Sequence, residues 1–170
     1  MIKNISNLGD AALYCDFGIE VNKKINSEVI KYFKAIKEKN IQGINNLTPS
    51  YNKLIISYDL RITNFKELKD KIEKLDIKEA EKVNNKKLEI PVCCDDSYSL
   101  DIERVKKKLN LTRDQILGNF FNKEYFCYMT GFIAGMPFLG DLDKNMRVQR
   151  LETPRIKVPK GSVGITEQFA

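Results

Sequence analysis

A stretch between residues 128 and 165 is dense in glycine and proline, and it constrains this chain more than any other feature. Such density excludes a regular helix, because glycine costs conformational entropy and proline lacks a backbone N–H donor. We therefore expect tight β-turns, as at the rim of a barrel. Large apolar side chains beside the glycines indicate either an apolar pocket wall or a corner of the core where aromatic rings cover glycines. The turn-forming residues are Gly131, Gly135, Pro137, Gly140, Pro154, Pro159, Gly161 and Gly164, and the apolar neighbours are Phe132, Met136, Phe138 and Leu139.

The first part of the chain shows the pattern of a small α+β sandwich. Apolar residues alternate in short runs bounded by turn residues, and they also recur at helical spacing in two longer stretches. Asn64 and Glu67 stand at the spacing of a capping box, which marks the start of the second helix. We therefore predict one sheet with two helices on one face. The predicted elements are strands over 11–17, 42–47 and 53–58, a helix over 24–40, and a helix that buries Phe65, Leu68, Ile72 and Leu75.

A polar stretch, residues 76–87, separates this part from the rest. We interpret this stretch as containing a linker between two domains. The predicted domains are residues 1–80 and 88–170, and the predicted linker is residues 81–87. The second domain is predicted to open with a strand over 88–94 and to continue with two short helices. The first helix places Ile102, Val105 and Leu109 on one face, and the second opens with a Thr112–Gln115 capping box and buries Ile116, Leu117 and Phe120. Strands and turns follow from Glu124.

The chain contains no histidine, which excludes several kinds of chemistry. A Ser-His-Asp triad, a Cys-His dyad and a His-ligated zinc site all require that residue. The four cysteines form no C-x-x-C pair, and a strand would point Cys93 and Cys94 to opposite faces. We therefore predict no metal site and four reduced thiols, most of them packed as small apolar side chains. Without a signal-peptide pattern or a long apolar run, we expect a cytoplasmic protein with no membrane partner.

Residues 144–160, called the basic segment below, carry a charge of +5, which is nearly the whole net charge of +6. Such a cluster suits a nucleic acid, an anionic small molecule or an acidic partner surface, or it simply keeps a strand edge solvated. We predict no nucleic-acid binding, because no motif of that class is present and the aromatic residues are not interleaved with these charges. The segment's basic residues are Lys144, Arg147, Arg150, Arg155, Lys157 and Lys160, and its acid is Glu152.

The run 158–164 offers a second kind of anion site. Backbone N–H groups around Gly161 and Ser162 can form an anion-binding nest, and Arg150 and Arg155 can each grip a carboxylate or phosphate with two hydrogen bonds. The alternative is a plain turn between strands. The spacing does not match a P-loop, so we do not predict that this chain binds ATP by itself.

Two stretches, GFIAGMPFLGDLD (131–143) and RLETPRIKVPKGSVGI (150–165), resemble the signature of a known family. This is the PxpB family, the B subunits of 5-oxoprolinase, which includes the kinase inhibitor KipI and the allophanate hydrolase subunit 1-type (carboxyltransferase) domain of urea carboxylases. Other short segments resemble the family pattern more weakly, and they follow the same order as in the family over nearly the whole chain. The chain departs from the family pattern at Phe120, Ala134, Met136 and Gln149, and it stops at Ala170 inside the motif, so we expect a fragment whose last strands are missing.

The resemblance implies a small α/β domain followed by a cyclophilin-like β-barrel domain, incomplete at its C-terminus. It also implies work with the A and C subunits of 5-oxoprolinase in the ATP-dependent opening of 5-oxoproline to L-glutamate, with ATP used at the level of the complex and the isolated chain inactive. Preorganised N–H groups and arginine would stabilise the anion that develops in this reaction. The resemblance does not identify the catalytic residues. The implied substrate- or partner-binding residues are Phe132, Gly135, Phe138, Arg150, Pro154, Arg155, Pro159, Gly161, Ser162 and Val163.

Three other functions remain open on these residues. A KipI-like protein would inhibit a sensor histidine kinase, and a carboxyltransferase-type domain would serve a urea carboxylase or allophanate hydrolase system. A prolyl isomerase would follow from the cyclophilin-like fold alone, but fold does not carry activity.

Overall fold

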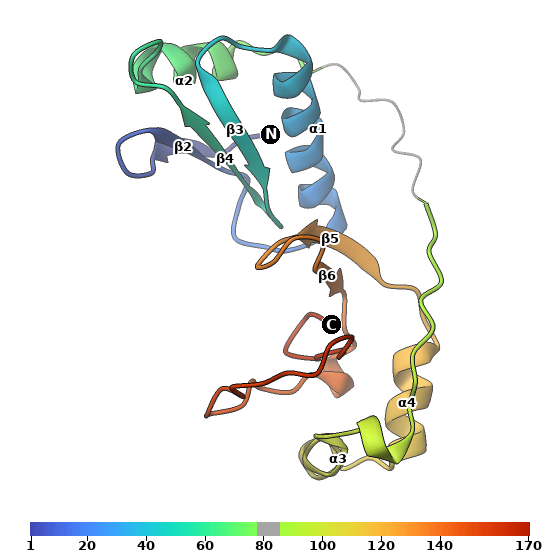
Figure 1. Cartoon of the computed structure of the whole chain (residues 1–170). Coiled ribbons are helices and arrows are strands. Elements are labelled where there is room, and N and C mark those ends of the chain that lie inside the picture. Colours follow the sequence, from blue (N-terminus) through green and yellow to red (C-terminus); the bar gives the residue numbers. More distant parts are fainter. Residues whose placement is uncertain (78–85) are drawn as a thin grey trace. The chain divides into compact units, whose positions relative to one another are not determined.

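The computed structural model describes residues 1–77 and 86–170. The chain divides into two compact units, Met1–Asn85 and Lys86–Ala170, which are described separately (Figure 1). The greater part of the predicted linker, 81–87, lies outside the described residues, and the domain limits stay predictions. No helix in the described parts is long and apolar enough to cross a membrane.

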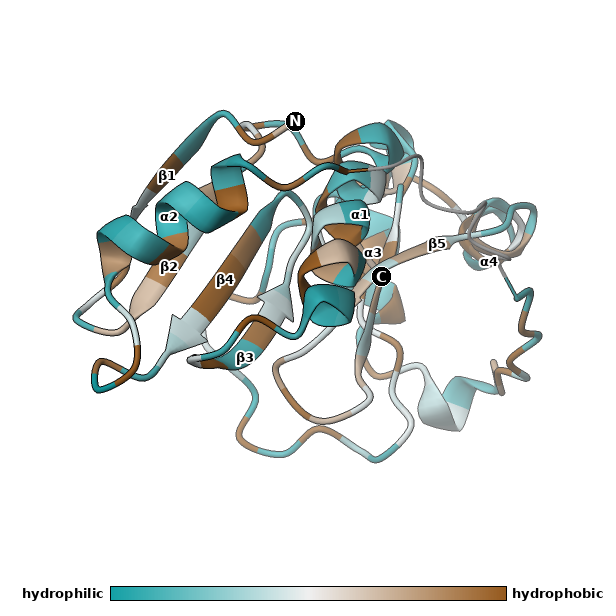
Figure 2. Ribbon diagram, turned by 90° about the horizontal axis from the view of Figure 1, so that it is seen from above, coloured by the Kyte–Doolittle hydropathy of each residue, from teal (hydrophilic) through white to brown (hydrophobic). Residues whose placement is uncertain are grey.

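The first unit is a four-stranded antiparallel sheet with two helices, in the strand order β1-β2-β4-β3. Side chains alternate along its two central strands, so that every second residue is buried. The helices place their apolar stripes against these same residues in one core, which confirms the prediction of two helices on one face (Figure 2). The elements are β1 (Asn4–Asn7), β2 (Ala12–Asp16), α1 (Lys23–Lys39), β3 (Ile44–Pro49), β4 (Lys53–Tyr58) and α2 (Phe65–Glu73).

Local side chains set the helix limits in this unit. The Asn22 side chain accepts a hydrogen bond from Ile25 N and begins α1, and Asn40 ends that helix in the left-handed conformation. Asn64 begins α2 by accepting from Glu67 N, as predicted. The Glu67 carboxylate completes the cap by accepting from the Asn64 side-chain amide at 2.8 Å rather than from the backbone.

The second unit contains the two predicted helices, and they begin as expected. The Thr112 side chain accepts from Gln115 N, while the Gln115 side chain accepts from Thr112 N, so the capping box is confirmed. A small core forms where the helices meet the segment after β6; its buried members are Val105, Ile116, Leu142, Met146 and Val148. The elements are η1 (Asp96–Tyr98), α3 (Ile102–Leu109), α4 (Arg113–Phe121), β5 (Phe126–Thr130), β6 (Pro137–Gly140) and η2 (Lys144–Met146).

The α+β class is confirmed, but the described residues of the second unit contain no closed barrel. Its sheet is the two-stranded pair β5–β6, which residues 166–170 extend through mutual Leu139–Ala170 backbone hydrogen bonds of 2.9 and 2.8 Å. Residues 150–164 form bends and turns, because Pro154 and Pro159 cannot donate to a strand ladder.

The strand predicted over 88–94 is wrong. This stretch forms no ladder, and Leu88 and Ile90 are exposed. Its alternating pattern suits a strand, but Pro91 removes a donor and the stretch pairs with no other strand of the described unit.

Candidate functional site

The tip of the β5–β6 hairpin presents an aromatic side chain in a strained backbone. Phe132 has a φ of +65° and is 89% exposed, which is unusual for a bulky residue on both counts. The loop is closed by hydrogen bonds from Gly131 N to Met136 O (3.0 Å) and from Met136 N to Ile133 O (3.2 Å). Gly135 has a φ of +81°, which glycine adopts without strain. The apolar residues at this tip therefore face solvent.

At the base of the hairpin, in contrast to the exposed tip, aromatic rings cover a glycine. A Cβ atom at Gly140 would lie 2.8 Å from Cε2 of Tyr128 and 3.3 Å from Cδ1 of Phe169. Phe138, also in β6, is half-buried. The sequence left two interpretations of this stretch, an apolar pocket wall or a corner of the core. The base of the hairpin is a corner of the core, whereas the apolar groups at its tip are exposed.

A buried phenol and a carboxylate meet beside that glycine. Tyr128 Oη donates to the Asp141 carboxylate at 3.1 Å, and Gln168 Nε2 donates to the same group at 2.6 Å. Burial, followed by the hydrogen bond to Asp141, raises the pKa of Tyr128 to about 12. Lys123 Nζ donates to Asp141 O and Asp143 Oδ1. The phenol therefore stays protonated at neutral pH and acts as a donor, not as a base.

Two side-chain links tie the basic segment to α3. Arg104 Nη2 donates to the carbonyls of Gln149 (2.8 Å) and Arg150 (3.3 Å). Arg155 Nη2 pairs with Asp101 Oδ1 at 2.6 Å. Of the two arginines predicted to bind anions, Arg155 thus has an internal partner. Arg150 is exposed, and within residues 86–170 its guanidinium has no hydrogen bond or ion pair.

The run 159–162 forms a closed β-turn. Ser162 N and Ser162 Oγ both donate to Pro159 O, at 3.2 and 2.7 Å, and Gly161 has a φ of +80°. This φ fits the third residue of a type II turn. Because both Ser162 donors are used within the turn, the geometry favours the plain turn over an anion-binding nest.

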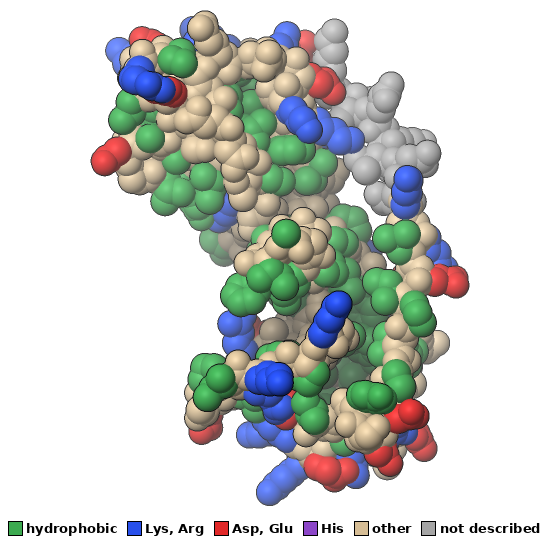
Figure 3. All heavy atoms as spheres, viewed as in Figure 1, with side chains coloured by type: hydrophobic (Ala, Val, Ile, Leu, Met, Phe, Trp, Pro, Cys, Tyr) green, Lys and Arg blue, Asp and Glu red, His purple; other side chains and the backbone are tan. Residues whose placement is uncertain are grey.

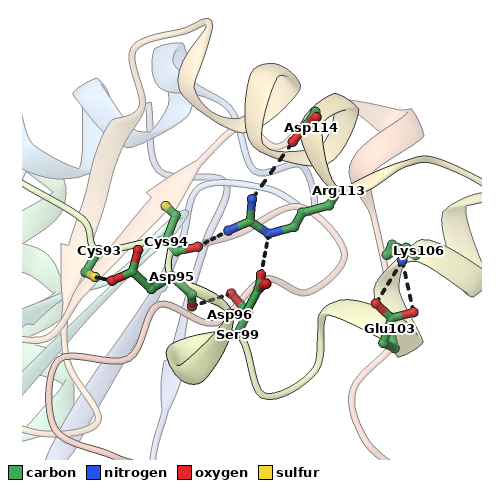
Figure 4. A network of polar contacts seen from close by, with 9 residues as sticks. All are labelled: Cys93, Cys94, Asp95, Asp96, Ser99, Glu103, Lys106, Arg113 and Asp114. Carbon is green, nitrogen blue, oxygen red and sulfur yellow. Dashed lines mark hydrogen bonds and ion pairs between the residues drawn. The ribbon is translucent and has the colours of Figure 1, made fainter.

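A second polar network lies before α4 (Figure 4). Arg113 donates from Nη2 to the Cys94 carbonyl and places Nε 3.2 Å from Asp96 Oδ1, so it fixes the start of α4 to the preceding loop. Cys93 is exposed and Cys94 half-buried, and their sulfur atoms point apart. All four thiols are free, but only Cys15 is buried, so the expectation that most would be packed is wrong. The described residues hold no cluster that fits a metal ion.

The exposed loops of the second unit combine apolar and basic groups. Figure 3 shows hydrophobic side chains at the hairpin tip and lysine and arginine side chains over the loops that follow β6. Ile156, Val158 and Val163 are exposed along the same loops. A hollow of about 750 Å³ lies elsewhere, at the turn between α3 and α4, and none of the ten predicted binding residues lines it.

Residues 3–170 match the protein family described as the carboxyltransferase domain, subdomain C and D. The chain belongs to this family. Two of its relatives are named as the B subunit of 5-oxoprolinase. The one from Bacillus subtilis is 33% identical over 95% of this chain and 72% of its own length. The one from Haemophilus influenzae is 29% identical over 95% of this chain and 75% of its own length.

Among solved structures, that of TTHA0988 has a TM-score of 0.79 and 26% identity over 93% of this chain. The matched region is only 31% of the TTHA0988 chain. The fold described above is therefore also found as one part of a chain about three times as long.

The ten predicted binding residues fall into three groups along the second unit. Phe132 and Gly135 lie at the hairpin tip and Phe138 in β6, while Arg150, Pro154 and Arg155 lie in the part of the basic segment tied to α3. Pro159, Gly161, Ser162 and Val163 lie in and beside the β-turn. Sequence reasoning missed Asp101, Arg104, Tyr128 and Asp141. Local spacing held no signal for the α3 links, because their partners lie 45 to 54 residues away.

Proposed function

We propose that this chain is the B subunit (PxpB) of an ATP-dependent 5-oxoprolinase, which opens 5-oxoproline to L-glutamate together with its A and C subunits. The observation that carries the proposal is the 33% identity to a 5-oxoprolinase B subunit over 95% of this chain. A protein named as a subunit implies partner proteins. The length of the TTHA0988 chain is consistent with such a module working next to further protein.

In this proposal the second unit binds a partner subunit through its exposed loops. Phe132 supplies an apolar anchor at the hairpin tip, and a left-handed residue kept in an exposed loop is typical of a binding site. Arg150 supplies a cation for an acidic group of the partner or the substrate. Gly135, Phe138, Pro154, Pro159, Gly161 and Val163 shape the loops that carry them.

Ser162, the one hydroxyl among the ten predicted binding residues, is not an evident nucleophile. Ser162 Oγ donates to Pro159 O, and no histidine exists to activate it. The Ser162 donors are used within their turn, so this turn does not fit a nucleotide phosphate either. We therefore propose that ATP is used at the level of the complex, that the isolated chain is inactive, and that the catalytic groups are completed by partner subunits.

Reconstitution tests the proposal. The chain is expressed with the A and C subunits of its own organism, and ATP hydrolysis that depends on 5-oxoproline is measured together with glutamate release. We expect activity only when all three proteins are present. Turnover by the chain alone, or full activity of the two other subunits without it, would contradict the proposal.

Two variants test the binding surface in the same assay. Phe132→Asn keeps a residue that tolerates positive φ but removes the ring, and we expect at least about tenfold weaker assembly. Arg150→Ala is expected to lower activity, whereas the matched control Arg61→Ala, an exposed arginine of the first unit, is expected to leave it unchanged. Equal behaviour of the two arginine variants would remove Arg150 from the site.

A second candidate follows from the family description itself. A carboxyltransferase-type domain would work with a biotin-dependent carboxylase, and a stable complex without 5-oxoproline turnover would favour it. Inhibition of a histidine kinase by the purified chain would favour the kinase-inhibitor alternative.

A further inference from the structure

We propose that the first turn of α3 is a clasp, formed by Asp101 and Arg104 with Arg155, that positions the basic segment for its partner. The proposal rests on the function proposed above. It assigns Arg155 a positioning role in place of the anion-binding role that the sequence predicts.

The clasp has two links that bracket residues 150–155. At one end Arg104 Nη2 reaches the backbone carbonyls of Gln149 and Arg150. At the other end the Arg155 guanidinium pairs with Asp101 Oδ1 at 2.6 Å. Asp101 at the N-cap and Arg104 in the first turn of α3 both reach this stretch, as their hydrogen bonds show.

These links replace the backbone ladder that a strand would have. Residues 150–155 lie outside every strand, and Pro154 has no N–H to donate. Asp101 stands at the N-cap position of α3, but its side chain does not cap its own helix, which leaves the carboxylate to Arg155. Val105, one residue after Arg104, is buried in the core with Val148, so the helix offers a fixed base for both links.

The clasp gives the two predicted arginines different roles. Arg155 forms an ion pair with Asp101, and their side chains are 32% and 44% exposed. Arg150 has its carbonyl held by Arg104, while its guanidinium points to no partner among the described residues of its unit. Arg150 is therefore the cation that the clasp presents, and Arg155 holds it in place.

A charge swap tests this division. Asp101→Arg and Arg155→Asp each place two like charges together, and the double variant restores an opposite pair. NMR order parameters of the backbone amides of residues 149–158 in the purified chain report the clasp without any partner. We expect each single variant to lower these order parameters toward the flexible range below about 0.6, and the double variant to restore them.

Assembly with the partner subunits gives the second measurement. Because a loosened segment is less often in the binding conformation, the apparent affinity should fall in each single variant, and the swap should restore it. Arg104→Gln is expected to behave like the single variants. Lys108→Ala, an exposed cation of the same helix outside the clasp, is the control and should change neither measurement.

The outcomes separate this proposal from the one on which it rests. If the swap restores the order parameters but not the affinity, Arg155 contacts the partner itself and the positioning role is overturned. If the order parameters are unchanged in both single variants, no clasp exists. If the native chain supports no 5-oxoprolinase activity while the order parameters behave as expected, the clasp stands and the proposed function fails.

Discussion

At the scale of single residues, the buried phenol of Tyr128 couples the second unit to pH. Its pKa is raised from the ordinary 10.0 to about 12, first by burial and then by the hydrogen bond to Asp141. A group whose pKa is higher in the folded than in the unfolded chain stabilises the fold below its unfolded pKa. The stabilisation is therefore complete below pH 10 and is lost as the pH rises toward 12.

We expect the second unit to lose about 2 kcal/mol of unfolding free energy across that range, and the Tyr128→Phe variant to lack this loss. Urea titrations at a series of pH values measure the difference. Phenolate absorbance provides the direct check, since one of the seven tyrosines should titrate last in the native chain. Titration of all seven near pH 10 in the folded chain would contradict the prediction.

At the scale of elements, two glycines of the second unit predict opposite effects of the same substitution. At Gly140, in β6, a new Cβ would lie 2.8 and 3.2 Å from the Tyr128 ring, and an aromatic ring cannot yield as a flexible chain can. At Gly118, inside α4, a Cβ meets nothing within 4 Å, and alanine favours a helix.

Gly140→Ala should therefore destabilise the unit by about 1–3 kcal/mol, and Gly118→Ala should stabilise it by about 0.5–1 kcal/mol. Denaturant midpoints of the two variants measure both effects, and each variant serves as the control of the other. A Gly140→Ala protein as stable as the native chain would mean that the Tyr128 ring moves aside at little cost.

Elements whose signals are local were predictable from the sequence. The helices α1 to α4 were found because apolar spacing and the caps at Asn64 and Thr112 act within one or two turns. Strand β1 was missed, since Ile5 is its one apolar residue and its existence depends on pairing with β2. The strand predicted over 88–94 does not form. Its sequence has an alternating pattern, but the pattern does not provide a second strand with which it could pair.

The same distinction applies to the candidate site. The hairpin tip and the turn at Gly161 were predictable, because glycine and proline act on the local backbone. The role of Arg155 was not, because its partner Asp101 lies 54 residues earlier in the chain. Long-range side-chain links of this kind carry no signal in a single sequence.

At the scale of the whole molecule, the two units differ in the size of their cores. Eleven buried residues form the core cluster of the first unit, and five form that of the second, among the residues the structure describes. The central strands β2 and β4 pair over five residue positions and bury Leu13, Leu54 and Ile56 completely. The β5–β6 pair contains an irregularity between Cys127 and Met129, and Cys127 is exposed.

Because each fully buried aliphatic side chain contributes about 1.5–3 kcal/mol, local opening should cost more in the first unit than in the second. Hydrogen exchange of the full chain, followed by mass spectrometry of its peptides, measures this order. We expect the amides of β2 and β4 to exchange at least about tenfold more slowly than those of β5 and β6. The Leu54→Ala variant should remove most of that difference by leaving a cavity in the first core, whereas Ile156→Ala, at a fully exposed position, should leave it unchanged. Equal protection of the two sheets in the native chain would show that core size does not set the order of opening.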